Sequence, residues 1–402
     1  MAADDVRTTG IAGTPFRLML GATVLGFSGY ALLLPVVPLW ASRGGSGALG
    51  AGATTGMLMA ATVATQLAVP WLLVRIGHRW VLGLGMVLLG APTPLLLLSA
   101  DLAPVLAISA VRGAGFGLVT VAGSALVAEL VPPAQHGRAA GRYGLAVGLP
   151  QLVLLAAGLA VVDRFGFAVV FVAAGVLPLL GAALVPAIRV PATSAPAEPV
   201  APGSLGRSAL PPVVAMLTCS VAQGGLITFL PLAVPDAGLL VALALFATSA
   251  GAMAGRLLAG DLVDRRDWGG RLLAPGMLLA AAGLVAEVVA VSAGGVVPLV
   301  TGAAAVGVGF GAVQNDALTG LFAAFGSTRY GTASAVWNIA FDAGTGVGAV
   351  GLGAVAGPFG YAAAFGLAAA LLCGGMAVTG VRPGRRSGGR GLPRPPADDR
   401  RS

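Results

Sequence analysis

Long apolar stretches alternate along the chain with short connections that carry most of the charged residues. A stretch of about 20 apolar residues is long enough to cross the hydrocarbon core of a membrane as a helix. The sequence contains twelve such stretches: 16–41, 50–74, 80–100, 103–128, 139–162, 166–188, 211–235, 237–260, 272–292, 296–321, 331–356 and 360–381. The short connections favour antiparallel neighbours in a bundle. The pattern therefore predicts an all-α membrane protein with twelve transmembrane helices.

The second half of the chain repeats features of the first half in the same order. Gly113–Gly117 reads Gly-Ala-Gly-Phe-Gly, and Gly307–Gly311 reads Gly-Val-Gly-Phe-Gly 194 residues later. Leu34-Pro35 returns as Leu230-Pro231 at an offset of 196 residues. Two homologous membrane halves imply a site between them, which is the architecture of a carrier.

The repeat and the polar segments around it predict five parts of the chain. The segment between the two halves is rich in Pro, Ala and Ser, as flexible linkers are, and the last segment is rich in Arg, Gly and Pro, which is typical of disorder. The parts are a cytoplasmic tail (1–15), a six-helix half (16–188), a cytoplasmic linker (189–210), a second six-helix half (211–381) and a disordered basic cytoplasmic tail (382–402).

The composition agrees with a membrane protein and excludes several functions. Hydrophobic residues make up 57% of the 402 residues and charged residues only 9%, with a mean hydropathy of +0.93. A soluble chain carries about a quarter charged residues, so the outer surface must face lipid. All 23 basic residues are arginine. The chain therefore lacks both the lysine with which a P-loop holds nucleotide phosphates and a lysine for a Schiff base.

The cysteines and histidines offer no metal site. Cys219 and Cys373 lie within apolar stretches, and His78 and His136 lie in short connections, without the spacing of metal ligands. We therefore expect no metal, no cofactor and no catalytic centre, so that the protein is not an enzyme.

The placement of the arginines predicts the orientation in the membrane. With the N-terminus inside, the inner tail and loops before the C-terminal tail hold 12 arginines, whereas the outer loops hold only Arg43 and Arg164. Because positive charge marks the cytoplasmic side, both termini are expected inside. The net charge of +8 thus reflects topology and not a nucleic-acid partner. The chain uses arginine but no lysine and is rich in Ala and Gly, which indicates a GC-rich bacterial genome. We therefore expect a multi-pass protein of the bacterial inner membrane. We also expect it to be a monomer.

Two charged residues lie deep within predicted helices, where a charge is costly unless it has a partner or a function. Asp342 lies near the middle of stretch 331–356 and is the first candidate for a proton-coupling site, because a carboxyl group exposed to each side in turn can load and release a proton. Arg112 lies well inside stretch 103–128, and we expect it to face the cavity or a proton relay.

A few further polar and aromatic residues complete the predicted pathway. Gln314, Asn315 and Asp316 are consecutive and spread over much of a helix circumference, so at least one should face the substrate. The other predicted substrate contacts are Tyr30, Gln223, Trp337 and Asn338. A cavity with so few polar groups suits a hydrophobic or amphipathic organic solute better than a sugar, which needs many hydrogen bonds.

One loop resembles the cytoplasmic signature loop of the major facilitator superfamily. In Gly260, Asp264 and Arg265 the glycine, aspartate and arginine of that signature match. The equivalent loop of the first half keeps Arg75 and Arg79 but lacks the glycine and the aspartate. The resemblance implies that these five residues form a conformational latch between two rocking halves; the alternative is that the arginines only mark the inner face.

Two further segments are similar to signatures of this family. Arg112 with Gly115 and Gly117 resembles the helix-four signature of proton-coupled facilitators, with the glycine displaced by one position. On stretch 139–162, a set of residues resembles the helix-five signature of drug-efflux antiporters, although Leu149 interrupts it; the set comprises Gly144, Gly148 and Pro150. Simple small-residue packing is the alternative explanation.

The resemblance covers about residues 16–381 and implies a secondary transporter that works by alternating access. The leading hypothesis is export of a small hydrophobic or amphipathic compound in exchange for protons, with substrate, protons and the lipid bilayer as the only partners. Two alternatives stay open: a proton-coupled importer of a nutrient, and a membrane sensor or assembly partner that transports nothing.

Overall fold

The computed structural model describes residues 10–132, 135–189, 206–234, 238–266, 268–325 and 330–379, and the regular elements in these ranges are all helices. Eleven described segments are long and apolar enough to cross a membrane. The last of them, Thr332–Ala377, has 46 residues, and Gly360 breaks it with a φ of 84° that favours glycine. It therefore crosses twice, and the predicted twelve-helix fold is confirmed.

The N-terminal half begins with a broken helix. Pro35 has no N–H group to continue the helix, and the first crossing segment divides there into α2 and α3. The elements of this half are α2 (Thr14–Leu33), α3 (Val36–Arg43), α4 (Gly47–Ile76), α5 (His78–Gly90), η1 (Thr93–Leu98), α6 (Leu102–Leu130), α7 (His136–Phe165), α8 (Phe167–Leu184) and η3 (Val185–Ala187).

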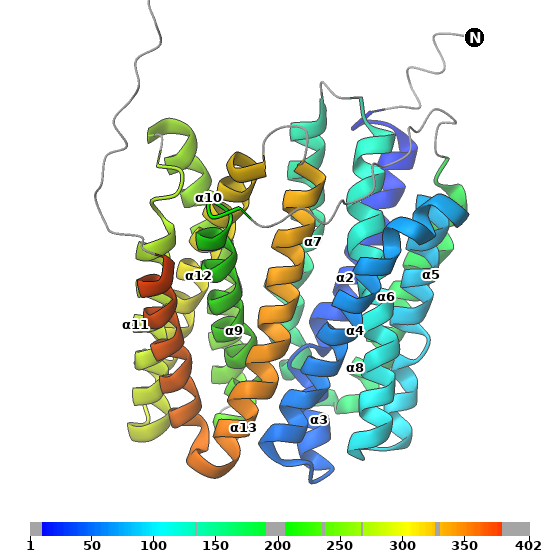
Figure 1. Cartoon of the computed structure of the whole chain (residues 1–402). Helices are drawn as coiled ribbons and strands as arrows, with labels where there is room; N and C mark the ends of the chain where they lie inside the picture. The colour runs from blue at the N-terminus through cyan, green and yellow to red at the C-terminus, as the bar shows by residue number, and fades with distance from the viewer. Residues whose placement is uncertain are drawn as a thin grey trace, which may run out of the picture.

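The C-terminal half repeats the six-helix arrangement with fewer breaks. Its elements are α9 (Leu210–Ala233), α10 (Gly238–Arg266), α11 (Leu273–Ala293), α12 (Val296–Phe325) and α13 (Tyr330–Thr379). Within this half α12 packs against both α10 and α11, and α13 packs against α9. The two halves stand side by side as bundles of long helices (Figure 1).

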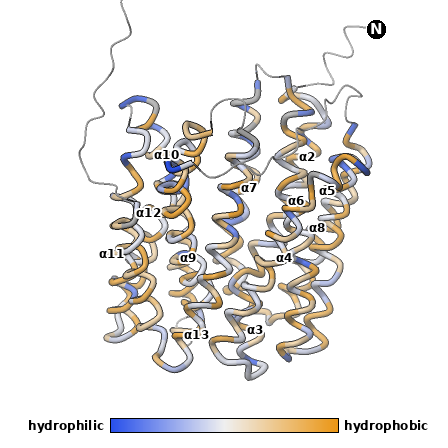
Figure 2. Tube along the Cα trace, viewed as in Figure 1, coloured by the Kyte–Doolittle hydropathy of each residue, from blue (hydrophilic) through white to orange (hydrophobic). Residues whose placement is uncertain are grey.

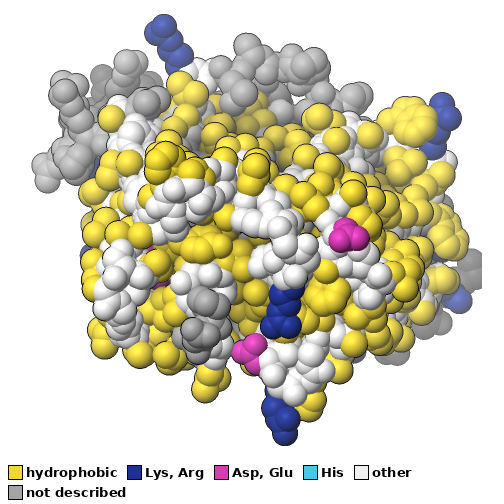
Figure 3. Space-filling model, turned by 90° about the horizontal axis from the view of Figure 1, so that it is seen from below, with side chains coloured by type: hydrophobic (Ala, Val, Ile, Leu, Met, Phe, Trp, Pro, Cys, Tyr) yellow, Lys and Arg dark blue, Asp and Glu magenta, His cyan; other side chains and the backbone are white. Residues whose placement is uncertain are grey.

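The bundle has two sides that differ in charge. We call the side that carries the starts of α2 and α5 the terminal side, and the side that carries Gly44, Gly166 and Gly360 the far side. Hydrophilic residues gather at the helix ends of the terminal side, above a hydrophobic middle (Figure 2). The far side is mostly hydrophobic and uncharged, with scattered charges (Figure 3). This asymmetry agrees with the arginine pattern, and the assignment of the terminal side to the cytoplasm stays a prediction.

The two halves touch mainly along two helix pairs, α4 with α13 and α7 with α10, and α9 also contacts α3 and α4. Near the far side, a Cβ atom on Gly353 would lie 2.8 Å from the Ala48 carbonyl oxygen, and one on Gly52 would overlap the Ala349 carbonyl group. Toward the terminal side α4 and α13 diverge (Figure 1). The described contacts between the halves therefore close the far side.

The predicted domain boundaries stay predictions. Most of the linker 189–210 and the tail 382–402 lie outside the described residues, as do residues 1–9 of the N-terminal tail.

Candidate functional site

Five polar residues from five helices lie at about the same depth in the bundle, and we call them the polar layer. Each is about 18 residues, or ~27 Å at 1.5 Å per residue, from the far-side end of its helix, which for α13 is Gly360. The polar layer consists of Gln66 on α4, Thr120 on α6, Arg256 on α10, Gln314 on α12 and Asp342 on α13. It therefore draws residues from both halves.

Asp342 connects the two halves through a hydrogen bond. The Gln66 side-chain amide donates to Asp342 Oδ2 at 2.7 Å and also lies 3.3 Å from the Thr120 hydroxyl. Asp342 is buried with 2% of its surface exposed, and Gln66 is buried with 7% exposed. A charge-assisted hydrogen bond in a medium of low dielectric is stronger than a neutral one. The predicted coupling residue thus lies at the junction that must change when the halves move.

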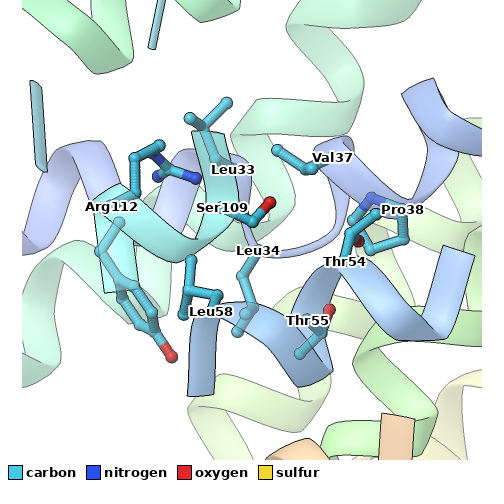
Figure 4. A pocket seen from close by; sticks show the side chains of 10 residues that line it. Leu33, Leu34, Val37, Pro38, Thr54, Thr55, Leu58, Ser109 and Arg112 are labelled. Atoms are coloured by element: carbon cyan, nitrogen blue, oxygen red, sulfur yellow. The ribbon is translucent and has the colours of Figure 1, made fainter. Parts of the chain in front are cut away.

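Arg112 occupies a small closed pocket nearer the far side. The pocket lies between α6, the bend from α2 to α3, and α4 (Figure 4). Arg112 is 1% exposed, and only about 10 Å³ of the pocket is open to the centre of a water molecule, which is room for about one water. The Arg112 Nε atom has no hydrogen-bond partner among the described residues. Arg112 is therefore buried beside a pocket that has room for about one water.

Tyr30 joins the Arg112 pocket to the polar layer. Its ring stacks on Phe116, with the ring centroids 4.0 Å apart and the planes 7° from parallel. Phe27 packs edge-on against both rings. The charges of Arg112 and Asp342 both act on the Tyr30 hydroxyl group. Tyr30 is thus close to both of the predicted coupling residues, and its aromatic face is already covered.

An arginine that the sequence analysis did not single out lies in the C-terminal half. The Arg256 guanidinium lies over the Trp337 ring, 6.0 Å from its centroid. The Trp337 indole N–H donates to the Gln314 carbonyl oxygen at 3.1 Å. Phe341 lies 6.1 Å from Trp337 and 5.8 Å from Phe310, measured between ring centroids. The available signal was the one that identified Arg112, a charge deep inside an apolar stretch.

The other predicted substrate contacts lie in the same half with different surroundings. The Gln223 side-chain oxygen on α9 is buried without a hydrogen-bond partner among the described residues. The Asn338 amide donates back to the Ser334 carbonyl of its own helix at 2.9 Å. Asn315 points its side-chain oxygen toward Gly260 of α10. Gln223 therefore has a free acceptor for a ligand, whereas Asn338 and Asn315 interact locally.

Asp316 holds the start of α11. Its two carboxylate oxygens accept hydrogen bonds from the backbone N–H groups of Gly270, Leu272 and Leu273 at 2.6, 2.8 and 3.1 Å. The first N–H groups of a helix have no partner within the helix, and a carboxylate supplies one. A substrate contact by Asp316 stays a prediction, and in this state its oxygens are already engaged.

The predicted latch residues interact within their own halves. Arg75 stacks on Trp71, and Arg79 stacks on Trp80 and donates to the Ile188 carbonyl oxygen at 3.3 Å. Arg265 pairs with Asp261 one turn earlier on α10 at 2.6 Å. Gly260 lies on the same helix, and the Asp264 side chain lies outside the described residues. The latch therefore stays a prediction for a state in which the terminal side is closed.

The antiporter-like residues Gly144, Gly148 and Pro150 lie on α7, with the two glycines on one face and Pro150 on the opposite one. A Cβ atom on Gly148 would lie 2.8 Å from the Met253 methyl group of α10, whereas one on Gly144 would meet nothing within 4 Å. Pro150 is buried inside the helix. The contact between α7 and α10 thus reaches Gly148 and not Gly144, which is one turn closer to the terminal side.

The described residues contain no group of three or more His, Cys, Asp or Glu side chains that could hold a metal ion. The chemistry of the site therefore rests on the arginines, the Asp342 carboxylate, the amides and the aromatic rings.

The fold is similar to solved structures of transporters at low sequence identity. One is a bacterial homologue of the human lysosomal transporter Spinster in an inward-facing and occupied conformation, with a TM-score of 0.74 and 16% identity over 91% of this chain and 95% of that chain. Another is a mutant of the peptide transporter POT, with a TM-score of 0.76 and 15% identity over 91% and 93%. POT in complex with sulfate has a TM-score of 0.75 and 16% identity over 95% and 98%.

These likenesses establish the fold and say nothing of the substrate. Among curated proteins, none is similar enough to count as a relative of this chain. Residues 18–349, however, match the family model of the Major Facilitator Superfamily. The chain therefore belongs to the Major Facilitator Superfamily, and it is a membrane transporter and not an enzyme.

Proposed function

We propose that this protein couples proton movement to the transport of a small amphipathic organic compound, with Asp342 as the proton-binding residue. The observation that carries this proposal is the hydrogen bond of 2.7 Å between Gln66 of one half and Asp342 of the other. A proton on Asp342 removes the charge that strengthens this bond. Proton binding thereby changes the free energy of contact between the halves.

Coupling requires that a ligand bind two conformations with different affinity. In this state the Gln66 amide donates to Asp342, and this hydrogen bond is stronger when the carboxylate is charged. When the halves separate at this point, Asp342 loses this donor and its surroundings change, so its affinity for a proton differs between the two conformations. Tyr30 lies between the two predicted coupling residues, since it lines the Arg112 pocket and is close to Asp342.

We place the substrate between the halves, against aromatic and amide groups of the C-terminal half. Trp337, Phe341 and Phe310 offer apolar surface, and Gln223 offers an acceptor without a partner. This combination of much apolar surface and few polar groups is typical of sites for amphipathic molecules.

Two directions of transport remain candidates. Export in exchange for protons rests on the antiporter-like residues Gly144, Gly148 and Pro150. Import together with protons is favoured by a different observation, the two arginines near the pathway, Arg112 and Arg256, against the single acid Asp342. A proton on Asp342 removes a negative charge from the region between the halves, which would favour the binding of an anionic solute there.

The test measures accumulation of fluorescent amphipathic anions and cations in bacterial cells that lack their own efflux carriers, with and without an uncoupler. Wild-type protein should change the accumulation of at least one compound several-fold, and the uncoupler should abolish the change. Lower accumulation identifies export and higher accumulation identifies import. Asp342→Asn should behave as the uncoupled wild type at equal expression.

Glu287 supplies the matched control. It is a fully buried carboxyl group on α11, where it lies beside Gly302 of α12. Glu287→Gln should keep uncoupler-sensitive transport, because this carboxyl group lies within one half. Gradient-driven transport that persists in Asp342→Asn would refute the assignment of the proton site. If no compound is transported and the protein instead forms a stable complex with another protein, the result would favour the alternative of a membrane sensor or assembly partner.

A further inference from the structure

Arg256 lies on the part of α10 that faces the space between the halves. Thr248 and Gly255 of α10 pack on α12, where they meet Gly307 and Val308. Met253 of the same helix touches Gly148 of α7 in the other half. At 100° per residue, Arg256 falls between these two contact directions. Its side chain therefore points into the angle between α12 of its own half and α7 of the other half.

The groups beside Arg256 lie on the pathway face of α12. Val313 and Asp316 of α12 point toward α11, as their contacts with Gly276 and Leu273 show. Gln314 lies on a different face, where its carbonyl oxygen receives the Trp337 indole N–H. The Trp337 ring is thus fixed in orientation beside the Arg256 guanidinium, 6.0 Å from it.

Arg256 has no counter-charge among the described residues. No ion pair or hydrogen bond of its guanidinium is present there, and the described acids of the same half are placed elsewhere. Asp342 receives Gln66, Asp316 holds the start of α11, and Glu287 lies between α11 and α12. A cation at membrane depth is costly without a partner. Arg256 therefore lacks a partner of the kind that such a position requires.

The two arginines near the pathway differ in access. Arg112 is 1% exposed in a pocket with room for about one water. Arg256 is only partly buried. Arg256 is therefore the more accessible of the two arginines.

We infer that Arg256 and Trp337 bind the anionic head of the substrate, a carboxylate or sulfonate, and that its apolar body packs on the Trp337 and Phe341 rings. The inference rests on the proposed transport function and specifies its substrate class. A guanidinium presents paired donors that match the two oxygens of such a head. Trp337 adds a rigid apolar surface whose orientation is set by its hydrogen bond to Gln314. An amphipathic cation would place like charges together at this point.

The test is binding of matched probes to the purified full-length protein, measured by isothermal titration calorimetry in detergent at neutral pH. The probes are 1-naphthylacetate, 1-naphthylacetamide and 1-naphthylmethylammonium, together with the same three head groups on an indole ring. Within each set of three probes, the apolar body is the same and the charge of the head group differs. The anions should bind at least about tenfold more tightly than the amides, because a hydrogen bond to a charged group contributes about one power of ten or more in affinity.

Arg256→Gln should remove the preference for the anion while leaving the weak binding of the amide. Arg256→Lys keeps the charge without the paired donors and should keep part of the preference, and it decides the test where Arg256→Gln does not fold. Arg164→Gln is the matched control, since Arg164 also lies over a ring, that of Phe165 at 5.5 Å, on the far side. It should bind as the wild type does.

Equal affinity for anion and amide, absence of binding by every anion, or a preference that survives Arg256→Gln would each overturn the inference. The assay needs no proton gradient, so its outcome is separate from that of the proposed function. An absent anion preference with a functional Asp342 leaves proton coupling intact. A clear anion preference without gradient-driven transport would instead refute the coupling alone.

Discussion

The two ends of the interface between the halves differ in how closely the helices approach. Near the far side, α4 and α13 meet through glycines, with Gly353 facing the Ala48 carbonyl and Gly52 facing the Ala349 carbonyl. Near the terminal side, a Cβ atom on Gly144 of α7 would meet nothing within 4 Å. On α7, Gly148, one turn nearer the far side than Gly144, still meets Met253 of α10. The contact between the halves therefore extends from the far side to about the depth of Gly148 and ends before Gly144.

Each half, by contrast, is held together at the terminal side by a contact of its own. In the C-terminal half, Asp316 binds the start of α11. In the N-terminal half, the first residue of α5, His78, lies 2.6 Å from Glu129 near the end of α6. Both contacts fix the start of the third crossing segment of the half. The halves are thus braced separately where they do not touch each other, which favours rocking as rigid bodies.

The largest effect is expected from a larger side chain at the far-side end of the interface, where the helices are closest. Gly52→Leu places a side chain against the Ala349 carbonyl group, and α4 cannot keep its present distance from α13. We expect the population of this state to fall at least about tenfold and the terminal side to close. Electron-spin distances between labels at Leu145 on α7 and Leu257 on α10 should shorten.

The labels require prior replacement of Cys219 and Cys373 by serine. Gly374→Leu is the matched control, because a Cβ atom on Gly374 meets nothing within 4 Å, and it should leave the distances unchanged. Unaltered distances in Gly52→Leu would show that the far-side contact does not set the conformation.

The second prediction compares the two braces. Asp316→Asn replaces one acceptor oxygen by a donor that faces backbone N–H groups, so buried donors lose their partner. We expect a loss of about 2–4 kcal/mol of stability. His78→Gln replaces one hydrogen-bond donor to Glu129 by another, in a pair whose side chains are 17% and 11% exposed, and we expect a loss of about 1 kcal/mol or less. The order of the unfolding midpoints in detergent tests this, and equal midpoints would contradict it.

The smallest effect on stability is expected at the open end. Gly144→Leu fits the present state without a clash, so the unfolding midpoint should stay within error of the wild type. Closure of the terminal side would bring α7 toward the other half, and the added side chain should then slow transport about tenfold or more. Wild-type transport rates in this variant would show that Gly144 never approaches another helix.

The sequence predicted the fold well because its main signals are local. Apolar length defines each span, and the repeated glycine segments define the halves, without knowledge of any contact. The exceptions are also local: Pro35 divides the first span into two helices, and Gly360 is the only break between the last two.

The site was less predictable, because its key contacts join distant residues. Asp342 and Arg112 were identified by their cost in a membrane, yet the partner of Asp342 is Gln66, which lies 276 positions away. No pattern in the sequence indicates that these two residues are in contact. Asp316 was expected to face the substrate as one of three consecutive polar residues, whereas its oxygens bind Gly270, Leu272 and Leu273 across a turn that only the fold brings near.

The glycine contacts between α4 and α13 also have a kinetic consequence. Helices that interlock through large side chains must change rotamers before one can roll over the other, and each change adds to the activation barrier. At Gly52 and Gly353 the backbone of one helix lies directly on the backbone of the other. Neither glycine has a side chain that must change its rotamer when the helices move. This part of the interface therefore adds little to the activation barrier of the movement between the halves.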